Sequence, residues 1–311
     1  MLQKTKIILD VDPGHDDAIA ILFAHKSPAI ELLAITTVAG NQTLEKVTLN
    51  ARKLCTVAGI TDVPIAAGCD RPLLRPQVIA PEIHGETGLD GPTFPEPTVP
   101  LDPRHAVDLI IELLMNSDGD IVLVPVGPLT NIALAMRKEP RILKKIKHIS
   151  LMGGAIGFGN KTPAAEFNIV VDPEAARIVF ESGVPITMVG LDLTHQALAT
   201  EPVVKRIAEL GTPVAQMTVE LLRFFGKTNK AVQDYDAPPV HDPAAVAWVI
   251  DPTIVQCEPM YVAVETQAEF SYGRTVCDAW RVTGKEPNAL VATKLDFHRF
   301  WDLVIDALAR Y

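Results

Sequence analysis

Short apolar segments alternate with segments of helical pattern along the first two thirds of the chain. The apolar segments are often β-branched, which is typical of strands buried on both faces of a sheet. This alternation predicts an α/β fold: an open, mostly parallel, Rossmann-like sheet with helices on both faces. The predicted strands are residues 6–11, 31–39, 63–67, 120–126, 148–152 and 185–191, and the predicted helices are residues 16–25, 43–58, 105–115, 129–138 and 172–182.

The last third of the chain has a different pattern. Asp242-Pro243 repeats the start signal of Asp172-Pro173, with Asp as N-cap and Pro in the first turn, so it predicts a helix over residues 244–250. A small β-rich part follows, with strands predicted at 260–265, 273–282 and 289–295, and then an amphipathic helix at 296–310. We find no clear linker, so we expect a single domain over residues 1–311. Residues 71–103 and 153–168 are long irregular segments, and such loops are often functional.

Composition excludes several classes of protein. The net charge is −10 and the basic residues are scattered, so we expect no nucleic-acid partner. The four cysteines show no CxxC pairing, which indicates reduced thiols in the cytosol. The N-terminus does not resemble a signal peptide, and no apolar stretch reaches the ~20 residues of a membrane span. We therefore expect a cytoplasmic protein without a membrane partner.

Four carboxylates crowd the first strand-to-helix turn: Asp10, Asp12, Asp16 and Asp17. Acidic side chains this close repel one another unless they share a cation, and hard oxygen ligands suit Ca²⁺ or Mg²⁺. Helix capping by Asp16 or Asp17 is the alternative, but capping accounts for one or two of the acids only. The turn therefore predicts a divalent-metal site at the carboxyl end of the first strand.

Further polar residues follow the carboxyl ends of other predicted strands, where open α/β sheets bind their ligands. Taken singly, each of them could have a purely structural role as a turn, loop or helix-cap residue. Because they all lie at the same edge of the sheet, we expect them to form one binding site together. These residues are Asn41, Asn131, Asn160, Glu166, Asn168, His241 and Asp242.

Such a set can hold a neutral sugar. Carboxylates accept hydrogen bonds from hydroxyls, a hard cation binds vicinal oxygens, and no Gly-rich phosphate loop is present. A cation-held water beside a carboxylate base is a usable nucleophile, and surrounding carboxylates would stabilise an oxocarbenium-like transition state. His84 and His241 are candidates to protonate a leaving group, although each could be an ordinary loop or helix-start histidine. Met152 is either a core residue or the floor of the pocket. His15, His25 and His105 are interpreted as ordinary.

The motifs resemble one known family, the inosine-uridine-preferring nucleoside hydrolases. Residues 10–17, DVDPGHDD, match that family's DxDPGxDD signature, which is highly specific. Further matching segments occur in the family's order along essentially the whole chain: VAGNQT at 38–43, IHGETG at 83–88, LMGG at 151–154, EFN at 166–168, GLDLT at 190–194 and VHDP at 240–243.

The resemblance implies hydrolysis of the N-glycosidic bond of ribonucleosides to free base and ribose. It implies a Ca²⁺ ion held by Asp12, Asp17, Asp242 and the main-chain carbonyl of Val126, with Asp12 also the general base. It further implies that His241 is the acid for the leaving base and that His84 lies near the nucleobase. The implied ribose ligands are Asp16, Asn41, Asn160, Glu166 and Asn168, with Met152 against the sugar. Relatives are commonly homo-oligomers, tetramers or dimers.

The nucleobase end is less defined. Gln233 and Tyr235 are both candidates to contact the base, and the motifs favour pyrimidine nucleosides, with a broad inosine-uridine specificity as the alternative. Two other classes compete. One is a HAD-type phosphotransferase, in which the first Asp of DxD is a covalent nucleophile. The other is a protein that binds nucleosides without catalysis.

Overall fold

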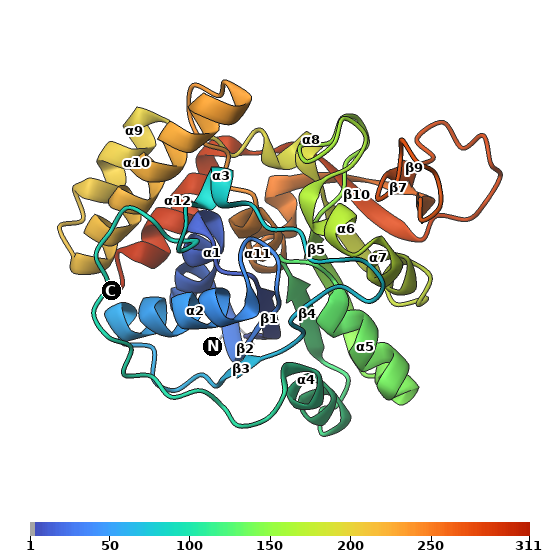
Figure 1. Ribbon diagram of the computed structural model, residues 1–311, viewed down its shortest axis with the longest axis horizontal. Coiled ribbons are helices and arrows are strands. Elements are labelled where there is room, and N and C mark those ends of the chain that lie inside the picture. The colour runs from blue at the N-terminus through green and yellow to red at the C-terminus, as the bar shows by residue number, and fades with distance from the viewer. Residues whose placement is uncertain (1–3) are drawn as a thin grey trace.

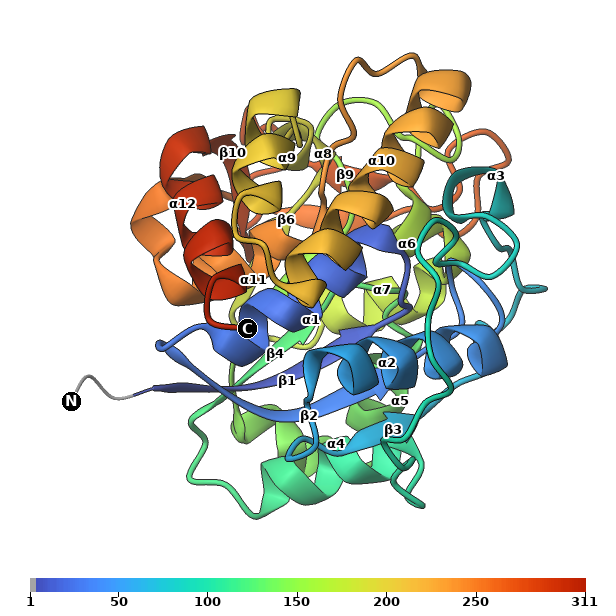
Figure 2. The same cartoon turned by 90° about the vertical axis from the view of Figure 1, so that its left-hand side faces the viewer.

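The computed structural model describes residues 4–311 and contains one large, mostly parallel sheet (Figures 1 and 2). Its strand order is β3-β2-β1-β4-β5-β6-β10-β7, and only β7 runs antiparallel to its neighbour. This confirms the predicted α/β class with an open, mostly parallel sheet. The strands are β1 Thr5–Val11, β2 Ile30–Thr37, β3 Ile65–Ala67, β4 Ile121–Pro125, β5 Ile146–Met152, β6 Ile186–Val189, β7 Val255–Met260 and β10 Ala289–Leu295.

Helices cover both faces of this sheet, as the alternating pattern predicted. One core lies between the sheet and α1, α2 and α9–α12, and the other lies between the sheet and α4, α5 and α7 (Figure 2). The helices are α1 His15–Lys26, α2 Leu44–Ala58, α3 Pro81–His84, α4 Ala106–Met115, α5 Thr130–Lys138, α6 Phe167–Val171, α7 Pro173–Phe180, α8 Leu191–Thr194, α9 Glu201–Ala208, α10 Pro213–Gln233, α11 Asp242–Ile250 and α12 Phe297–Leu308.

The order of the strands reverses between β1 and β4. From β1 the chain winds outward through β2 to β3, and it then returns to place β4 on the other side of β1. In open α/β sheets, ligands bind outside the carboxyl ends of the strands at such a reversal. Asp12 follows β1 and Val126 follows β4. The topology therefore brings the acidic turn and Val126 to the position where a ligand site is expected.

The C-terminal third departs from the expected strands. Residues 255–260 form β7, which the sequence analysis missed, because three of its six side chains are exposed at the edge of the sheet. The predicted strands 260–265 and 273–282 shrink to β8 Val262–Val264 and β9 Thr275–Cys277, which pair only with each other. The strand predicted at 289–295 is confirmed as β10.

The sequence analysis also missed α9 and α10, although Thr212-Pro213 carries the start signal used elsewhere in the chain. The Thr212 side chain accepts a hydrogen bond from the Ala215 N–H, which is an N-cap contact. At the other repeated signal, the helix begins at Asp242 itself, and the Asp242 side chain caps nothing there. Its carboxylate is therefore available for the site. Among residues 4–311, no helix is long and apolar enough to cross a membrane.

Candidate active site

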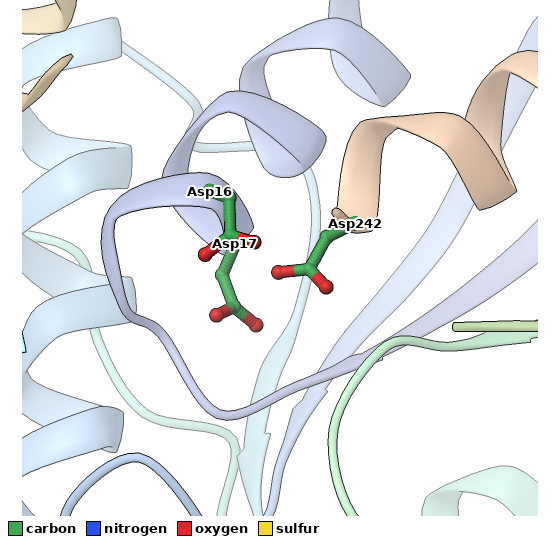
Figure 3. A group of neighbouring side chains, drawn as sticks. All are labelled: Asp16, Asp17 and Asp242. Carbon is green, nitrogen blue, oxygen red and sulfur yellow. The ribbon is translucent and has the colours of Figure 1, made fainter. Parts of the chain in front are cut away.

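Three carboxylates from two segments meet at the reversal of the sheet. Asp16 and Asp17 lie in the first turn of α1, and Asp242 is the first residue of α11 (Figure 3). One oxygen from each of these three side chains lies within 4.8 Å of the others. All three are buried. The predicted cluster therefore forms, and it joins residues that are more than 200 positions apart in the chain.

Asp12 lies beside this cluster and is fully buried. Its Oδ2 accepts a hydrogen bond of 2.7 Å from the Asn41 N–H, whereas its Oδ1 has no hydrogen-bond partner among the described residues. Gly40 and Gly127 flank the carboxylate, and a Cβ atom on either would lie 2.1 Å or 2.4 Å from one of its oxygens. The chain thus leaves room for the Asp12 carboxylate by placing glycine on both sides.

Asp10 does not belong to the site, although it was counted with the acidic turn. Its Oδ1 accepts hydrogen bonds from the Thr36 hydroxyl (2.5 Å) and from Asn131 Nδ2 (2.8 Å). Asn131 also donates to the Thr37 carbonyl and accepts from the Cys69 N–H. Asp10 and Asn131 therefore join β1, β2 and α5 below the site, and neither lines the cavity described next.

A cavity opens directly above the acid cluster. Predicted site residues that follow different strands converge on it. Its walls come from α1, from the segments at or after the carboxyl ends of β2, β4 and β5, from the two long loops, and from α10 and α11. Among the predicted site residues, the cavity is lined by Asp16, Asn41, His84, Val126, Met152, Asn160, Glu166, Asn168, Gln233, His241 and Asp242. Asp12 and Asp17 lie beneath this surface, and both are fully buried.

Burial raises the pKa of the clustered carboxyls, and mutual repulsion adds to the effect. The pKa of Asp17 is raised to about 7, and the pKa values of Asp12 and Asp242 are raised well above their usual range. Main-chain N–H groups oppose this shift only in part: Asp17 accepts from Gly14 at 2.9 Å and from Asp12 at 3.0 Å. A divalent cation would satisfy the unpartnered Asp12 oxygen and remove the repulsion, so this donor set fits a hard cation.

The far wall of the cavity is built on Glu166. Its carboxylate accepts hydrogen bonds from the N–H groups of Gly154 (2.9 Å), Asn168 (2.9 Å) and Ile169 (3.1 Å), and so caps α6. Burial raises its pKa to about 7. Asn168 Nδ2 donates to the carbonyls of Val126 (2.7 Å) and Met152 (3.1 Å). These contacts hold Glu166 and Asn168 against the ends of β4 and β5.

His241 and His84 both line the cavity. The Nδ1 of His241 is 2.7 Å from the Thr194 hydroxyl, and the His241 N–H donates to Asp16 Oδ2 at 3.0 Å. Burial lowers the pKa of His241 to about 4, so this imidazole is neutral near pH 7. Burial also lowers the pKa of His84 well below its usual range. Neither histidine carries a positive charge in the free protein.

Helix α10 supplies the part of the cavity that sequence reasoning left open. Gln233 lines the cavity, together with Phe225, Asn229 and Val232. Tyr235 lies outside the lining, and its hydroxyl is 3.0 Å from His195 Nε2. The start signal at Thr212-Pro213 could have predicted this helix, but not which of its side chains face the cavity.

Comparison with known proteins agrees with this geometry. Residues 7–302 match the family model described as inosine-uridine preferring nucleoside hydrolase. The pyrimidine-specific ribonucleoside hydrolases RihB of Shigella sonnei (strain Ss046) and of Escherichia coli (strain K12) are each 51% identical over 310 residues, which cover 100% of this chain and 99% of theirs.

Solved structures of the same kind share the fold. A plant nucleoside hydrolase, PpNRh1, has a TM-score of 0.92 at 32% identity, covering 99% of this chain and 100% of its own. A purine-preferring ribonucleoside hydrolase from Gardnerella vaginalis has a TM-score of 0.92 at 34% identity, covering 98% of each chain.

The raised carboxyl pKa values predict that a divalent cation stabilises the protein more strongly at pH 8 than at pH 6. Protons occupy carboxyls with a pKa near 7 at pH 6 and compete with the cation, whereas at pH 8 the carboxylates are free to bind it. We expect Ca²⁺ to raise the melting temperature of chelator-treated protein, with the larger increment at pH 8. Differential scanning fluorimetry with and without Ca²⁺ at each pH measures this increment.

The test variant is Asp242→Asn, which should lose most of the increment in melting temperature that Ca²⁺ gives. Its matched control is Asp62→Asn, which replaces an exposed carboxylate and should keep that increment. An increment that is equal at both pH values, or unchanged in Asp242→Asn, would contradict the assignment of these carboxylates to a cation.

Proposed function

This chain belongs to the inosine-uridine preferring nucleoside hydrolase family, and we propose that it hydrolyses the N-glycosidic bond of pyrimidine ribonucleosides such as uridine and cytidine. The observation that carries the base preference is the 51% identity, over the full length, to relatives named as pyrimidine-specific. The fold does not separate the preferences, because a purine-preferring enzyme shares it at 34% identity. A broad inosine-uridine specificity is the alternative.

We propose Ca²⁺ as the cation, held by Asp12, Asp17, Asp242 and the Val126 carbonyl. Asp16 also belongs to the geometric cluster, but it lines the cavity and its Oδ2 already accepts from the His241 N–H. We therefore assign Asp16 to the substrate. The Val126 carbonyl accepts one hydrogen bond from Asn168 and keeps a second lone pair. When bound, the cation would draw ribose hydroxyls and water toward its positive charge and lower the pKa of that water.

Asp12 is proposed as the general base, because its Oδ1 is buried and unpartnered beside the cavity. Such an atom can accept a proton from a water that attacks the anomeric carbon. The ribose would lie among Asp16, Asn41, Asn160, Glu166 and Asn168, with Met152 against the sugar; of these, all line the cavity. Their carboxylates would stabilise positive charge on the sugar in the transition state.

His241 is proposed to assist departure of the base. If the Thr194 hydroxyl donates to Nδ1, the proton of the neutral ring lies on Nε2. Negative charge that develops on the leaving base would raise the pKa of the ring and strengthen the hydrogen bond from Nε2. His84 also lines the cavity, near the proposed position of the base.

The competing phosphotransferase mechanism does not fit this site. It requires the first Asp of the DxD pair, Asp10, as a nucleophile. Asp10 is fully buried, is held by Thr36 and Asn131, and lies outside the cavity lining. A protein that only binds nucleosides could hold the same cation, and it is the full-length similarity to relatives named as ribonucleoside hydrolases that favours catalysis.

Replacement of Asp12 tests the proposed reaction. Asp12→Ala should lower kcat for uridine by ~10²–10⁴-fold, because a positioned general base contributes about that much. We expect uridine and cytidine to be better substrates of the wild type than inosine and adenosine in an assay for released reducing sugar. The exposed Asp62→Ala serves as the control and should match the wild type. Wild-type turnover by a folded Asp12→Ala variant would remove Asp12 from the mechanism, and inosine turnover equal to that of uridine would favour the broad specificity.

The two candidates for base recognition predict different outcomes. Gln233 lines the cavity, so Gln233→Ala should raise KM for uridine about tenfold through the loss of a hydrogen bond. Tyr235 bonds to His195 outside the lining, so Tyr235→Phe should leave KM within about twofold. Steady-state kinetics on uridine measures both. The reverse result would place Tyr235, and not Gln233, at the base.

We also propose that the chain forms homo-oligomers through the β8–β9 segment, which projects from the body at the right of Figure 1. This segment comprises residues 262–288; Phe270, between β8 and β9, and Trp280 and Val282, directly after β9, are each more than 80% exposed. Aromatic side chains bury ~150–250 Å² each, so Phe270 and Trp280 together supply roughly half of the ~800 Å² that a subunit buries in a stable interface.

Trp280→Ser is expected to shift this assembly toward smaller species in sedimentation velocity. Leu74→Ser, which replaces an apolar side chain with 73% exposure on a different loop, is the control. A wild-type monomer at micromolar concentration, or an unchanged assembly in Trp280→Ser, would rule out this surface.

A cytoplasmic location remains part of the proposal. All four cysteines are free, and burial raises the pKa of Cys55 and of Cys69 to about 12. Thiols of this kind are unreactive small apolar side chains, as in proteins of a reducing compartment.

A further inference from the structure

One part of the cavity wall, the loop between β5 and α6, is held in a fixed shape. The Lys161 N–H donates to the Ala165 carbonyl at 3.3 Å, which closes the loop into a turn. Gly159 packs so closely against this turn that a Cβ atom there would lie 2.2 Å from the Ala165 carbonyl oxygen. The Asn160 side chain accepts a hydrogen bond from the Phe167 N–H at 2.9 Å. The side chain of Lys161 therefore starts from a backbone position that the loop fixes.

The ammonium of Lys161 extends from this loop to the other long loop. Its Nζ donates to Glu82 Oε1 at 2.7 Å and to the Ile79 carbonyl at 3.4 Å. It also lies 5.6 Å from the centroid of the Phe167 ring, which is a cation–π distance. Lys161, Glu82 and Phe167 all line the cavity, and 26% of the Lys161 side chain is exposed. The ammonium is therefore held at the cavity wall, beside the helix α3 that carries Glu82 and His84.

A positive charge at this place stands out against the rest of the cavity. Among the described residues that line it, Lys161 is the only lysine or arginine, and four others are acidic: Asp16, Glu82, Glu166 and Asp242. An ammonium has three N–H donors. Glu82 and the Ile79 carbonyl take two of them, and the third has no partner among residues 4–311. That donor is therefore available to a ligand in the cavity.

The reaction under the proposed function, on which this step rests, creates a need for such a donor. When the N-glycosidic bond breaks, its electron pair stays with the base, and the negative charge spreads to the carbonyl oxygens of the ring. The carboxylates of the cavity repel that charge. A hydrogen bond from a cation to one of these oxygens strengthens as the charge develops, so it lowers the barrier to bond breaking.

We propose that Lys161 is a catalytic residue that donates a hydrogen bond to a carbonyl oxygen of the pyrimidine base and stabilises its negative charge as it departs. Glu82 is then a positioning residue that holds the ammonium at the base end of the cavity. Lys161 keeps its proton throughout. The proton released by the attacking water, which Asp12 accepts in the proposed reaction, balances the charge on the base.

A comparison of two leaving groups of nearly equal shape tests this role. Fluorine withdraws electrons from the ring, so the base of 5-fluorouridine departs as an anion more readily than uracil and gains less from a cation. We expect Lys161→Met to lower kcat/KM by ~10-fold or more for uridine but by less than about threefold for 5-fluorouridine. Lys161→Arg keeps a cationic donor and should restore most of the uridine value. Steady-state kinetics of the Ca²⁺-loaded full chain measures each value.

The alternative is that the ion pair of Lys161 with Glu82 only joins the two long loops. Glu82→Gln breaks this ion pair but keeps the ammonium, so it should not widen the difference between the two substrates. Lys138→Met, which replaces an exposed, ion-paired lysine outside the cavity lining, should match the wild type. Equal losses on both substrates in Lys161→Met, or the same pattern of losses in Glu82→Gln, would show a loop-joining role and overturn the proposal.

The same assay separates this assignment from the reaction on which it rests. A wild type that hydrolyses neither nucleoside would overturn the proposed function, and the assignment of Lys161 with it. A wild type that hydrolyses uridine, with an unchanged kcat/KM in Lys161→Met, would overturn the assignment of Lys161 alone.

Discussion

The structure depends on the burial of several carboxylates at the carboxyl end of β1. Asp12, Asp16, Asp17 and Asp242 are all buried, and burial raises the pKa values of all four. An isolated buried carboxylate is too costly for a fold to tolerate. Here the cost is offset by main-chain N–H groups of the turn, by the N-terminal ends of α1 and α11, and by a site that fits a divalent cation. If the cation or one of these main-chain donors is lost, the buried carboxylates carry negative charge that nothing else compensates.

This constraint explains which parts of the site could be predicted from the sequence. Asp12, Asp16 and Asp17 are close in the chain, and a shared cation is one of the few physical reasons for several acidic residues in one tight turn. Asp242 was identified with the other polar residues at the shared edge of the sheet, and only the resemblance assigned it to the cation, because its local pattern is that of a helix cap. Asp10 was grouped with the wrong partners, because the sequence does not show that Thr36 and Asn131 hold its carboxylate below the site. Proximity in the chain predicted that these acidic residues lie close together, but not which of their side chains face the site.

The base end of the cavity was harder to predict for a physical reason. Its walls come from α3 and α10, whose residues lie more than 100 positions apart in the chain. Gln233 and Tyr235 are two residues apart near the end of α10, yet one lines the cavity and the other contacts His195. His15 was interpreted as ordinary, since nothing local distinguishes it. Its contacts with Asp90 and His84 cross about seventy residues of chain.

The two ends of the cavity are therefore supported by different elements. The acidic end is built on the carboxyl ends of β1 and β4 and on the first turns of α1 and α11. The base end is built on one long helix and on a loop packed against it. A substitution on α10 can change contacts with a base without disturbing the cation-binding carboxylates, because the two sets share few supporting hydrogen bonds. We therefore propose that α10 and the His84 loop hold the determinants of base preference, which agrees with the fold that this chain shares with a purine-preferring relative.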